Sequence, residues 1–424
     1  MARLRDEDRH SAMKIFCALG PGNIVADAMR DGGIVAGVTG YSFSQQLRRL
    51  LVAHGITGVL VTSNPDAGRV EQGGLTFQNL PRRGEGATGL GFHLSRIWYG
   101  VRLAVYARRI GADLAIIDSG STHYFMLTLF KLLGIPVAVN FHNVRWPNGF
   151  EPRGTLKTLI RKLDSWFFRH IAAGAMGCSP ECGVQARSDG AAHLRYFGWT
   201  SQFAASDPHP VDPFADPASP FRLLFSGRVE RSKGVFDLLA MAQALRNAPG
   251  RAVSIEVCGD GGALSELRAE VDRLGLGDCV TLRGRLERGE LDAAYHNCHA
   301  LIVPTRGDFC EGMPLVCAEA VLTAKPIITS RLSNALPVIG ECILEAVPEN
   351  IDSYLDAIRT LADDSATYAR LQSACASASV QFTERSLGYA AAVDRLIASI
   401  FSAHVPLHTY DALYDVKSVS NVAA

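Results

Sequence analysis

Short apolar runs and stretches of helical periodicity alternate along most of the chain, with glycine-rich or polar loops between them. Apolar runs of this length predict buried strands, and the intervening periodic segments predict helices. The predicted strands are 13–19, 58–62, 113–118, 135–143, 175–180, 221–226, 253–258, 279–284, 300–303 and 325–330. The predicted helices include 41–54, 94–109, 124–133, 155–173, 264–274, 314–322, 351–362 and 386–401. This alternation is typical of α/β folds with parallel sheets covered on both faces.

The length of the chain and a proline-rich segment indicate two domains. A chain of 424 residues is too long for one ordinary core. Residues 206–220 contain five prolines among polar residues, which predicts a stiff interdomain linker. The predicted domains are therefore 13–205 and 221–385. Residues 65–91 are rich in glycine and predict a loop with one short strand near 75–77.

Composition and charge exclude several classes of function. Lysine plus arginine and aspartate plus glutamate both total 42, so no general basic field argues for nucleic-acid binding. No apolar run reaches the length of a membrane span, and the N-terminus does not resemble a signal peptide. Ten cysteines without paired spacing are expected to be reduced, as in the cytoplasm. The cluster of His296, Cys298 and His299 lacks acidic partners, so no metal site is predicted.

Two glutamates bracket the start of a predicted helix in the second domain. The strand 300–303 leads into a polar loop that ends with Glu311, and Glu319 lies about two turns inside the following helix. Pro314 is expected in the first helical turn, where a missing N–H costs nothing. The N–H groups of Leu315 and Val316 would then point out of the helix N-terminus, which attracts phosphate.

A second motif lies just after the predicted linker. The strand 221–226 runs into Gly227-Arg228, and Lys233-Gly234 follows within the same loop. Two fixed cations at a strand end could clamp a pyrophosphate and neutralise the charge on a departing nucleoside diphosphate. The sequence therefore predicts a nucleotide site where this loop meets the loop carrying Glu311.

These two motifs together resemble retaining glycosyltransferases of family 4, which have the GT-B fold. Two glutamates at this spacing would otherwise be typical of a helix cap and a solvated helix face. The resemblance implies two Rossmann-like, doubly wound parallel-sheet domains that face a central cleft. It also implies that helix 386–401 returns to complete the N-terminal domain. Met313-Pro314 departs from the family pattern of an aromatic residue and a glycine, and Pro314 removes one backbone donor.

The resemblance assigns expected roles to individual positions. Arg228 and Lys233 would hold the donor diphosphate, Glu319 the ribose hydroxyls, and Glu311 the transferred sugar. His142, at the end of a predicted strand, would contact that sugar, although a histidine bonded to loop backbone is the alternative. The catalytic set implied is Glu311, His142, Arg228 and Lys233. Further donor-binding positions implied are Gly20, Gly22, Gly259, Arg283, Gly312, Met313, Leu315 and Val316.

The expected reaction moves a sugar from a nucleoside-diphosphate sugar, such as a UDP- or GDP-sugar, without a cofactor or metal. The expected acceptor is a glycan or lipid-linked molecule in cell-surface polysaccharide or glycoconjugate biosynthesis. The alternatives are a GT-B-type sugar-nucleotide epimerase and a non-catalytic sugar-nucleotide sensor. Helix 155–173 is basic and amphipathic, which predicts peripheral contact with an anionic membrane at its inner face or, alternatively, an arginine-rich solvent face.

Overall fold

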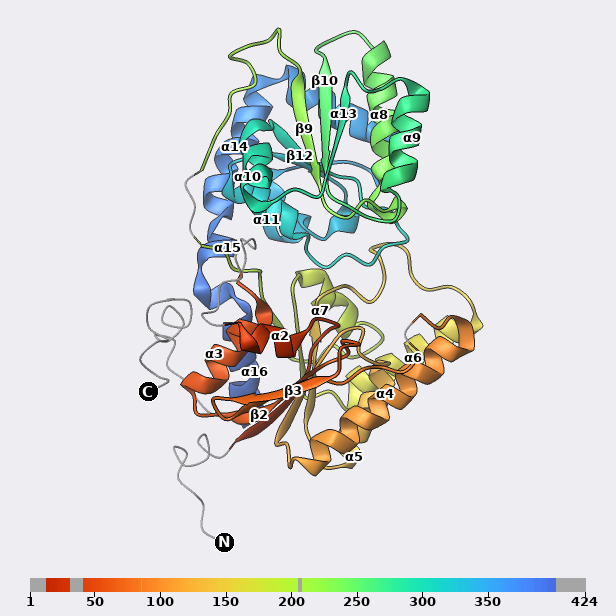
Figure 1. Ribbon diagram of the computed structural model, residues 1–424, viewed down its shortest axis with the longest axis vertical. Helices are drawn as coiled ribbons and strands as arrows, with labels where there is room; N and C mark the ends of the chain where they lie inside the picture. Colours follow the sequence, from red (N-terminus) through yellow and green to blue (C-terminus); the bar gives the residue numbers. More distant parts are fainter. Residues whose placement is uncertain (1–12, 31–40, 85, 205–207, 402–424) are drawn as a thin grey trace.

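The computed structural model describes residues 13–30, 41–84, 86–204 and 208–401, which form two α/β domains stacked one above the other (Figure 1). The N-terminal sheet has eight strands in the order β3-β4-β2-β1-β5-β6-β7-β8. Its strands are β1 (Lys14–Ala18), β2 (Thr57–Thr62), β3 (Gly68–Gln72), β4 (Leu75–Asn79), β5 (Leu114–Asp118), β6 (Val137–Phe141), β7 (Gly174–Gly177) and β8 (Tyr196–Gly198). Its helices are α2 (Ile24–Met29), α3 (Phe43–Ala53), α4 (Gly89–Arg109), η1 (Tyr124–Leu127), α5 (Thr128–Leu132), α6 (Thr155–His170) and α7 (Pro180–Arg187).

The C-terminal sheet has six parallel strands in the order β11-β10-β9-β12-β13-β14. Its strands are β9 (Phe221–Ser226), β10 (Val253–Cys258), β11 (Val280–Gly284), β12 (Ala300–Val303), β13 (Ile327–Thr329) and β14 (Ile343–Glu345). Its principal helices are α8 (Val235–Asn247), α9 (Leu264–Leu274), α10 (Arg288–Asn297), α11 (Leu315–Leu322), α12 (Leu336–Ile339), α13 (Ile351–Asp363), α14 (Ser365–Ala378) and α15 (Val380–Thr383). Strand order reverses between β9 and β12, and ligands of open α/β sheets bind at such a reversal. The expected fold of two parallel-sheet α/β domains is confirmed.

The short strand predicted near 75–77 within the loop 65–91 is confirmed as β4, but β3 was not predicted, and the two form a hairpin. Strands β3 and β4 pair antiparallel across Gly73 and Gly74, whose φ angles are 59° and 74°. Two consecutive positive φ values are those of a tight hairpin turn, and glycine adopts them without steric cost. The N-terminal sheet is therefore mixed, with one antiparallel edge strand. Helix α4 also begins earlier than predicted, at Gly89 instead of Leu94.

Helix α16 (Tyr389–Phe401) packs against α3 and β7, so the end of the described chain lies in the N-terminal domain (Figure 1). Its apolar residues from Tyr389 to Ile397 belong to the same buried core as β1 and β5. The linker lies against the C-terminal domain, where the buried Lys325 ammonium donates to the carbonyl of His209 at 2.9 Å. None of the described helices is both long and apolar enough to span a bilayer.

Direct contacts join the two domains near the predicted site. The Val144 N–H donates to the Glu311 carbonyl at 3.4 Å, and α12 lies against α7. The Met313 side chain packs against the N-terminal core and against a C-terminal cluster. The predicted donor loop therefore touches both domains.

Candidate active site

Lys233 is fixed at the carboxyl end of β12 by the glycine that follows it. Gly234 has a φ of 75°, and a Cβ built there would lie 2.1 Å from the Pro304 carbonyl oxygen. Only glycine permits so close an approach, which brings the Lys233 turn against the end of the neighbouring strand. The Lys233 ammonium pairs with the Glu311 carboxylate and lies 3.8 Å from the centre of the Phe309 ring. The two predicted motifs thus meet at one point.

Glu311 is buried, with 8% of its surface exposed. The loop that carries it is held from both sides, because the Glu311 carbonyl accepts from Asn334 Nδ2 at 2.7 Å and from the Val144 N–H. Asn334 has a φ of 56°, a left-handed conformation that asparagine tolerates better than most residues. Sequence reasoning missed Asn334, although an asparagine just after a predicted strand was a usable signal.

Arg228 stands on the solvent side of the same cluster. Its side chain is 60% exposed, and its guanidinium lies 2.8 Å from Glu230, with Cζ 5.4 Å from the Phe309 ring centre. Phe309 is therefore shared by both predicted phosphate-binding cations, and it was not singled out from the sequence. An aromatic ring attracts cations electrostatically and restricts the positions they occupy. Lys233 is therefore the cation inside the site, and Arg228 is the cation at its opening.

Glu319 is held on α11 by two residues of α10. Its carboxylate accepts from Arg288 Nη1 at 2.9 Å and from the Tyr295 hydroxyl at 3.0 Å. Burial, reinforced by the Glu319 charge, raises the pKa of Tyr295 well above its usual range, so Tyr295 remains a neutral donor. Arg288 and Tyr295 were missed because the helix that carries them was not predicted.

The helix N-terminus differs from the prediction by one position. Pro314 is the N-cap, with extended angles of φ −64° and ψ 127°, and α11 begins at Leu315. The Cys317 N–H donates to the Pro314 carbonyl at 3.1 Å. The N–H groups of Leu315 and Val316 precede the hydrogen-bond ladder of the helix, as any first-turn groups do. The first helical turn still presents donors beside Glu311.

The remaining predicted donor positions are spread over several strand ends. The Gly259 N–H donates to the Gly284 carbonyl at 2.7 Å, which ties the ends of β10 and β11 together. The Arg283 guanidinium lies 2.7 Å from Glu256 on the adjacent strand. Gly20 and Gly22 lie after β1, and a Cβ built at either one meets no atom within 4 Å. Packing therefore gives no reason for glycine at Gly20 or Gly22, and no described contact joins them to Lys233.

His142 lies across the domain contact from Glu311. Its Nε2 is 2.9 Å from Asp118 at the end of β5 and 3.0 Å from Asn140 Nδ2. A Cβ on Gly312 would lie 2.0 Å from the His142 carbonyl oxygen, so the backbones of the two loops are in contact. Asp118 was inside a predicted strand but was not predicted as a partner. The backbone of the histidine predicted from its strand end thus reaches the Glu311 loop, and its ring is held by Asp118 and Asn140.

The acidic partner decides the ionisation of His142. Burial lowers the pKa of His142, but the charge of Asp118 and its hydrogen bond outweigh this effect and leave the pKa raised above 6.5. The protonated pair therefore stabilises the fold below about pH 6.5, and this contribution disappears as the pH rises through the raised pKa.

Asp118→Asn is expected to reverse this behaviour. The burial effect, which is the largest influence on this histidine, would then outweigh the remaining charge of Cys182, so the pKa of His142 would fall below 6.5 and acidification would destabilise the fold. NMR titration of the histidine ring and melting temperature between about pH 5 and 8 measure both effects. Asp113→Asn is the control, because Asp113 directly precedes β5 and, among the described residues, its carboxylate accepts from the Lys14 N–H at 2.8 Å. An unchanged His142 pKa in Asp118→Asn would contradict this assignment.

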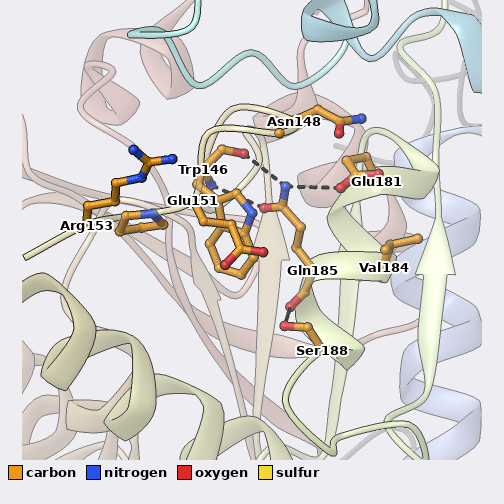
Figure 2. Close-up of a pocket in the computed structure, with 10 residues that line it drawn as sticks. Trp146, Asn148, Glu151, Arg153, Glu181, Val184, Gln185 and Ser188 are labelled. Carbon is orange, nitrogen blue, oxygen red and sulfur yellow. Dashed lines mark hydrogen bonds between the residues drawn. The ribbon is translucent and has the colours of Figure 1, made fainter.

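Two adjoining hollows open beside the site over residues 145–153. The larger, of about 830 Å³, has Gly307, Asp308 and Cys310 of the donor loop on one side and residues of α6 on the other. The smaller, of about 610 Å³, is lined by Trp146, Arg153 and residues of α7. Figure 2 shows Gln185 of α7 bonded to Glu181 and to the Trp146 carbonyl at the wall of this hollow. The larger hollow connects the two domains at the cleft.

Within the described residues, histidine, cysteine, aspartate and glutamate form no group of three that could hold a metal ion. The site is instead made of ion pairs and hydrogen bonds between two strand-end loops and one helix.

Comparison with known proteins matches both halves of the chain. Residues 41–197 match the family "Glycosyl transferase 4-like domain", and residues 213–377 match "Glycosyl transferases group 1". D-inositol 3-phosphate glycosyltransferase 1 of Catenulispora acidiphila is 30% identical over 197 residues, which is 44% of this chain and 45% of that protein. The chain thus spans about half the length of this curated relative.

Solved structures share the fold over almost the whole chain. Sucrose-phosphate synthase of Thermosynechococcus elongatus has a TM-score of 0.66 at 17% identity, over 92% of this chain and 100% of that chain. Anabaena HepE in complex with UDP has a TM-score of 0.61 at 14% identity, with coverage of 92% and 100%. At such low identities, the structural similarity is evidence of the fold alone. With both halves matched in order, the chain joins a glycosyl transferase 4-like domain to a glycosyl transferases group 1 domain in the two-domain arrangement of the GT-B fold.

Proposed function

We propose that the chain transfers a sugar from a nucleoside-diphosphate sugar to a glycan or lipid-linked acceptor, with retention of anomeric configuration. The observation that carries this proposal is the meeting of Lys233 and Glu311 beside the first turn of α11. This arrangement combines a cation for a diphosphate with a buried carboxylate for sugar hydroxyls. It lies at the reversal of strand order, the usual ligand position in open α/β sheets.

The charges of the cluster suit a departing diphosphate. Lys233 and Arg228 would contact the phosphates, and the N–H groups of Leu315 and Val316 would complete their shell. Stabilising the negative charge that develops on the leaving group is a large source of rate in group transfer. Lys233 would then contact both the phosphates and Glu311. This shared contact would hold the sugar in a fixed position relative to the diphosphate.

The carboxylates act as acceptors of hydroxyl donors in this proposal. Glu319, oriented by Arg288 and Tyr295, would accept from the ribose hydroxyls, and Glu311 from the sugar hydroxyls. His142 would contact the sugar from the opposite domain. Retention would follow from reaction on one face, with the leaving phosphate oxygen taking the proton of the incoming acceptor hydroxyl. Positioning and charge then supply the rate without a protein nucleophile.

The acceptor would occupy the hollows over residues 145–153. The larger one adjoins the donor loop at Cys310 and carries the aromatic surfaces of Trp146 and Phe150, on which sugar rings can pack. UDP is the favoured nucleotide, because Anabaena HepE, which shares the fold, was solved with UDP and with UDP-glucose. A donor in the cleft and an acceptor in the hollow would meet beside His142.

A donor screen tests this proposal. UDP- and GDP-sugars are added to the protein, and the melting temperature and nucleoside-diphosphate release are followed. The correct donor should raise the melting temperature by several degrees at saturating concentration and be slowly hydrolysed. Stabilisation without release in the presence of acceptors would indicate a sensor, and conversion to an epimeric donor would indicate an epimerase. No response to any nucleotide sugar would overturn the proposal.

A further inference from the structure

Arg306 lies shortly after β12, in the loop that leads to Glu311. Its Nη1 donates to both carboxylate oxygens of Asp237, in the first turn of α8, at 2.8 Å each. Its Nη2 lies 3.8 Å from Glu349 Oε2, and Glu349 Oε1 accepts from the Gly307 N–H at 2.8 Å. One arginine thus joins three segments that are far apart in the sequence. We call Arg306, Asp237 and Glu349 the arginine clamp.

The main chain of Arg306 connects the two motifs of the site. Its N–H donates at 2.9 Å to the carbonyl of Ser232, the residue before Lys233. Its carbonyl accepts from the Phe309 N–H at 3.2 Å. The Lys233 ammonium lies 3.8 Å from the centre of the Phe309 ring. Arg306 therefore contacts both the turn that carries the inner cation and the residue that carries the ring beneath it.

Burial and geometry make the arginine clamp a firm support. The Asp237 side chain is only 17% exposed, and salt screens such partly buried pairs less than surface pairs. Burial raises the pKa of Asp237, and the pair with Arg306 opposes this effect, so the charged carboxylate depends on its partner. Glu349 has a φ of 57°, a left-handed conformation of a tight turn. Its carboxylate is therefore presented to Gly307 by a turn with a defined backbone conformation.

Gly307, which Glu349 holds, is also where this loop meets the N-terminal domain. A Cβ built on Gly307 would lie 2.5 Å from the Phe150 ring, so the ring rests directly on this glycine. Phe150 belongs to the segment 145–153, which lines the larger hollow. The arginine clamp therefore supports the loop both beside Lys233 and beside the hollow where we place the acceptor.

We propose that Arg306 is a positioning residue of the transferase site. Its pairs with Asp237 and Glu349 hold the loop in one conformation. That conformation keeps the Lys233 ammonium over the Phe309 ring, so the cation is in place before a diphosphate binds. Arg306 acts through these two residues and does not contact the donor. A charged group that is already in place costs no reorganisation during the reaction. The effect on transfer rests on the proposed function, whereas the placement of Lys233 does not.

The placement of Lys233 can be measured by NMR without any substrate. Protons held over the face of an aromatic ring resonate upfield, so the side-chain signals of Lys233 in protein with isotopically labelled lysine report its contact with Phe309. The signal missing in Lys233→Gln assigns them. In Arg306→Met the signals are expected to move back toward the ordinary lysine position. Arg306→Lys keeps a charge for Asp237 but not the second nitrogen, so its signals should move less.

A second variant and a control keep this test independent of general unfolding. Glu349→Ala removes a side chain that is 34% exposed, and it should move the Lys233 signals in the same direction by a smaller amount. Arg246→Met is the control, because it removes an ion pair with Asp278, at 3.2 Å, from the last turn of α8. Its Lys233 signals should be those of wild type. Unchanged signals in folded Arg306→Met, or in both Arg306→Lys and Glu349→Ala, would overturn the proposal.

Turnover separates positioning from a purely structural role. At saturating donor, Arg306→Met is expected to have a kcat about 10- to 100-fold below wild type, the effect of a small displacement of reacting groups. Arg306→Lys should recover part of this loss. A lower melting temperature with a wild-type kcat and wild-type Lys233 signals would show a structural arginine and overturn the proposal. Absence of turnover in wild type would instead contradict the proposed function, and the Lys233 signals would still decide the placement.

Discussion

Replacing Lys233 by alanine is expected to lower the transfer rate by about 100- to 1000-fold, the effect of removing one charge-stabilising donor from an active site. Lys233 is the inner cation of the cluster, with only 15% of its side chain exposed. The alanine variant leaves the Glu311 carboxylate buried without its charged partner. This unpaired negative charge also repels a diphosphate. Donor-induced stabilisation should disappear together with turnover. Calorimetric titration with the nucleoside diphosphate and an initial-rate assay measure the two effects.

Two further variants separate phosphate binding from structural damage. Arg231→Ala removes a cation from the same turn, but Arg231 is 64% exposed and pairs with Glu266 on α9. It should retain activity within about twofold, as expected for an exposed ion pair. Lys233→Gln keeps a hydrogen-bond donor for Glu311 without the charge. If Lys233→Gln folded normally and bound the diphosphate as tightly as wild type, Lys233 would not be the phosphate cation.

Gly312→Ala is expected to lower the transfer rate nearly as much as Lys233→Ala does, for a steric reason. The new methyl group would lie 2.0 Å from the His142 carbonyl oxygen and 2.5 Å from Cys178 Sγ, both in the other domain. Contacts this short cannot exist, so the Glu311 loop or the domain contact must shift. A displacement of about 1 Å at reacting groups can cost on the order of 100-fold in rate. The initial rate at saturating donor and the radius of gyration in solution measure the consequence.

Gly262→Ala provides the matched substitution in the same domain. A Cβ built at Gly262 meets no atom within 4 Å, so this variant should behave as wild type. Gly312→Ala should open the domain contact and reduce turnover while the C-terminal domain still binds nucleotide. Wild-type turnover in Gly312→Ala would show that the contact between Gly312 and His142 is not required during catalysis.

Local sequence patterns predicted much of the fold. Strands β9 and β12 are buried apolar runs, and each is followed by a loop whose residue types already indicate phosphate and sugar binding. Because parallel strands end at one edge of a sheet, Lys233 and Glu311 could be expected to lie close together. The polar loop and Pro314 also located the start of α11 to within one residue.

Partners that are distant in the sequence were not predictable in the same way. Asp118 pairs with His142 only because β5 and β6 are neighbours, and Asn334 reaches the Glu311 carbonyl from beyond the next strand. Strand order and loop conformation decide such pairs. An asparagine after a predicted strand marks a candidate site residue, but its local sequence does not name its partner. The pair of Arg288 with Glu319 depended on a helix whose periodicity was too weak to recognise.

The sequence by itself determined the α/β class, the positions of most strands, and the residue types at the ends of β9 and β12. These follow from local hydrophobic periodicity and turn chemistry, which act within a few residues. Only the tertiary structure decided which side chains meet and which faces stay exposed. Periodicity showed that α6 is amphipathic, but packing on η1 decided that Phe167 and Phe168 are buried and that Leu159 and Trp166 face outward. The choice between two apolar faces is made by the neighbouring elements.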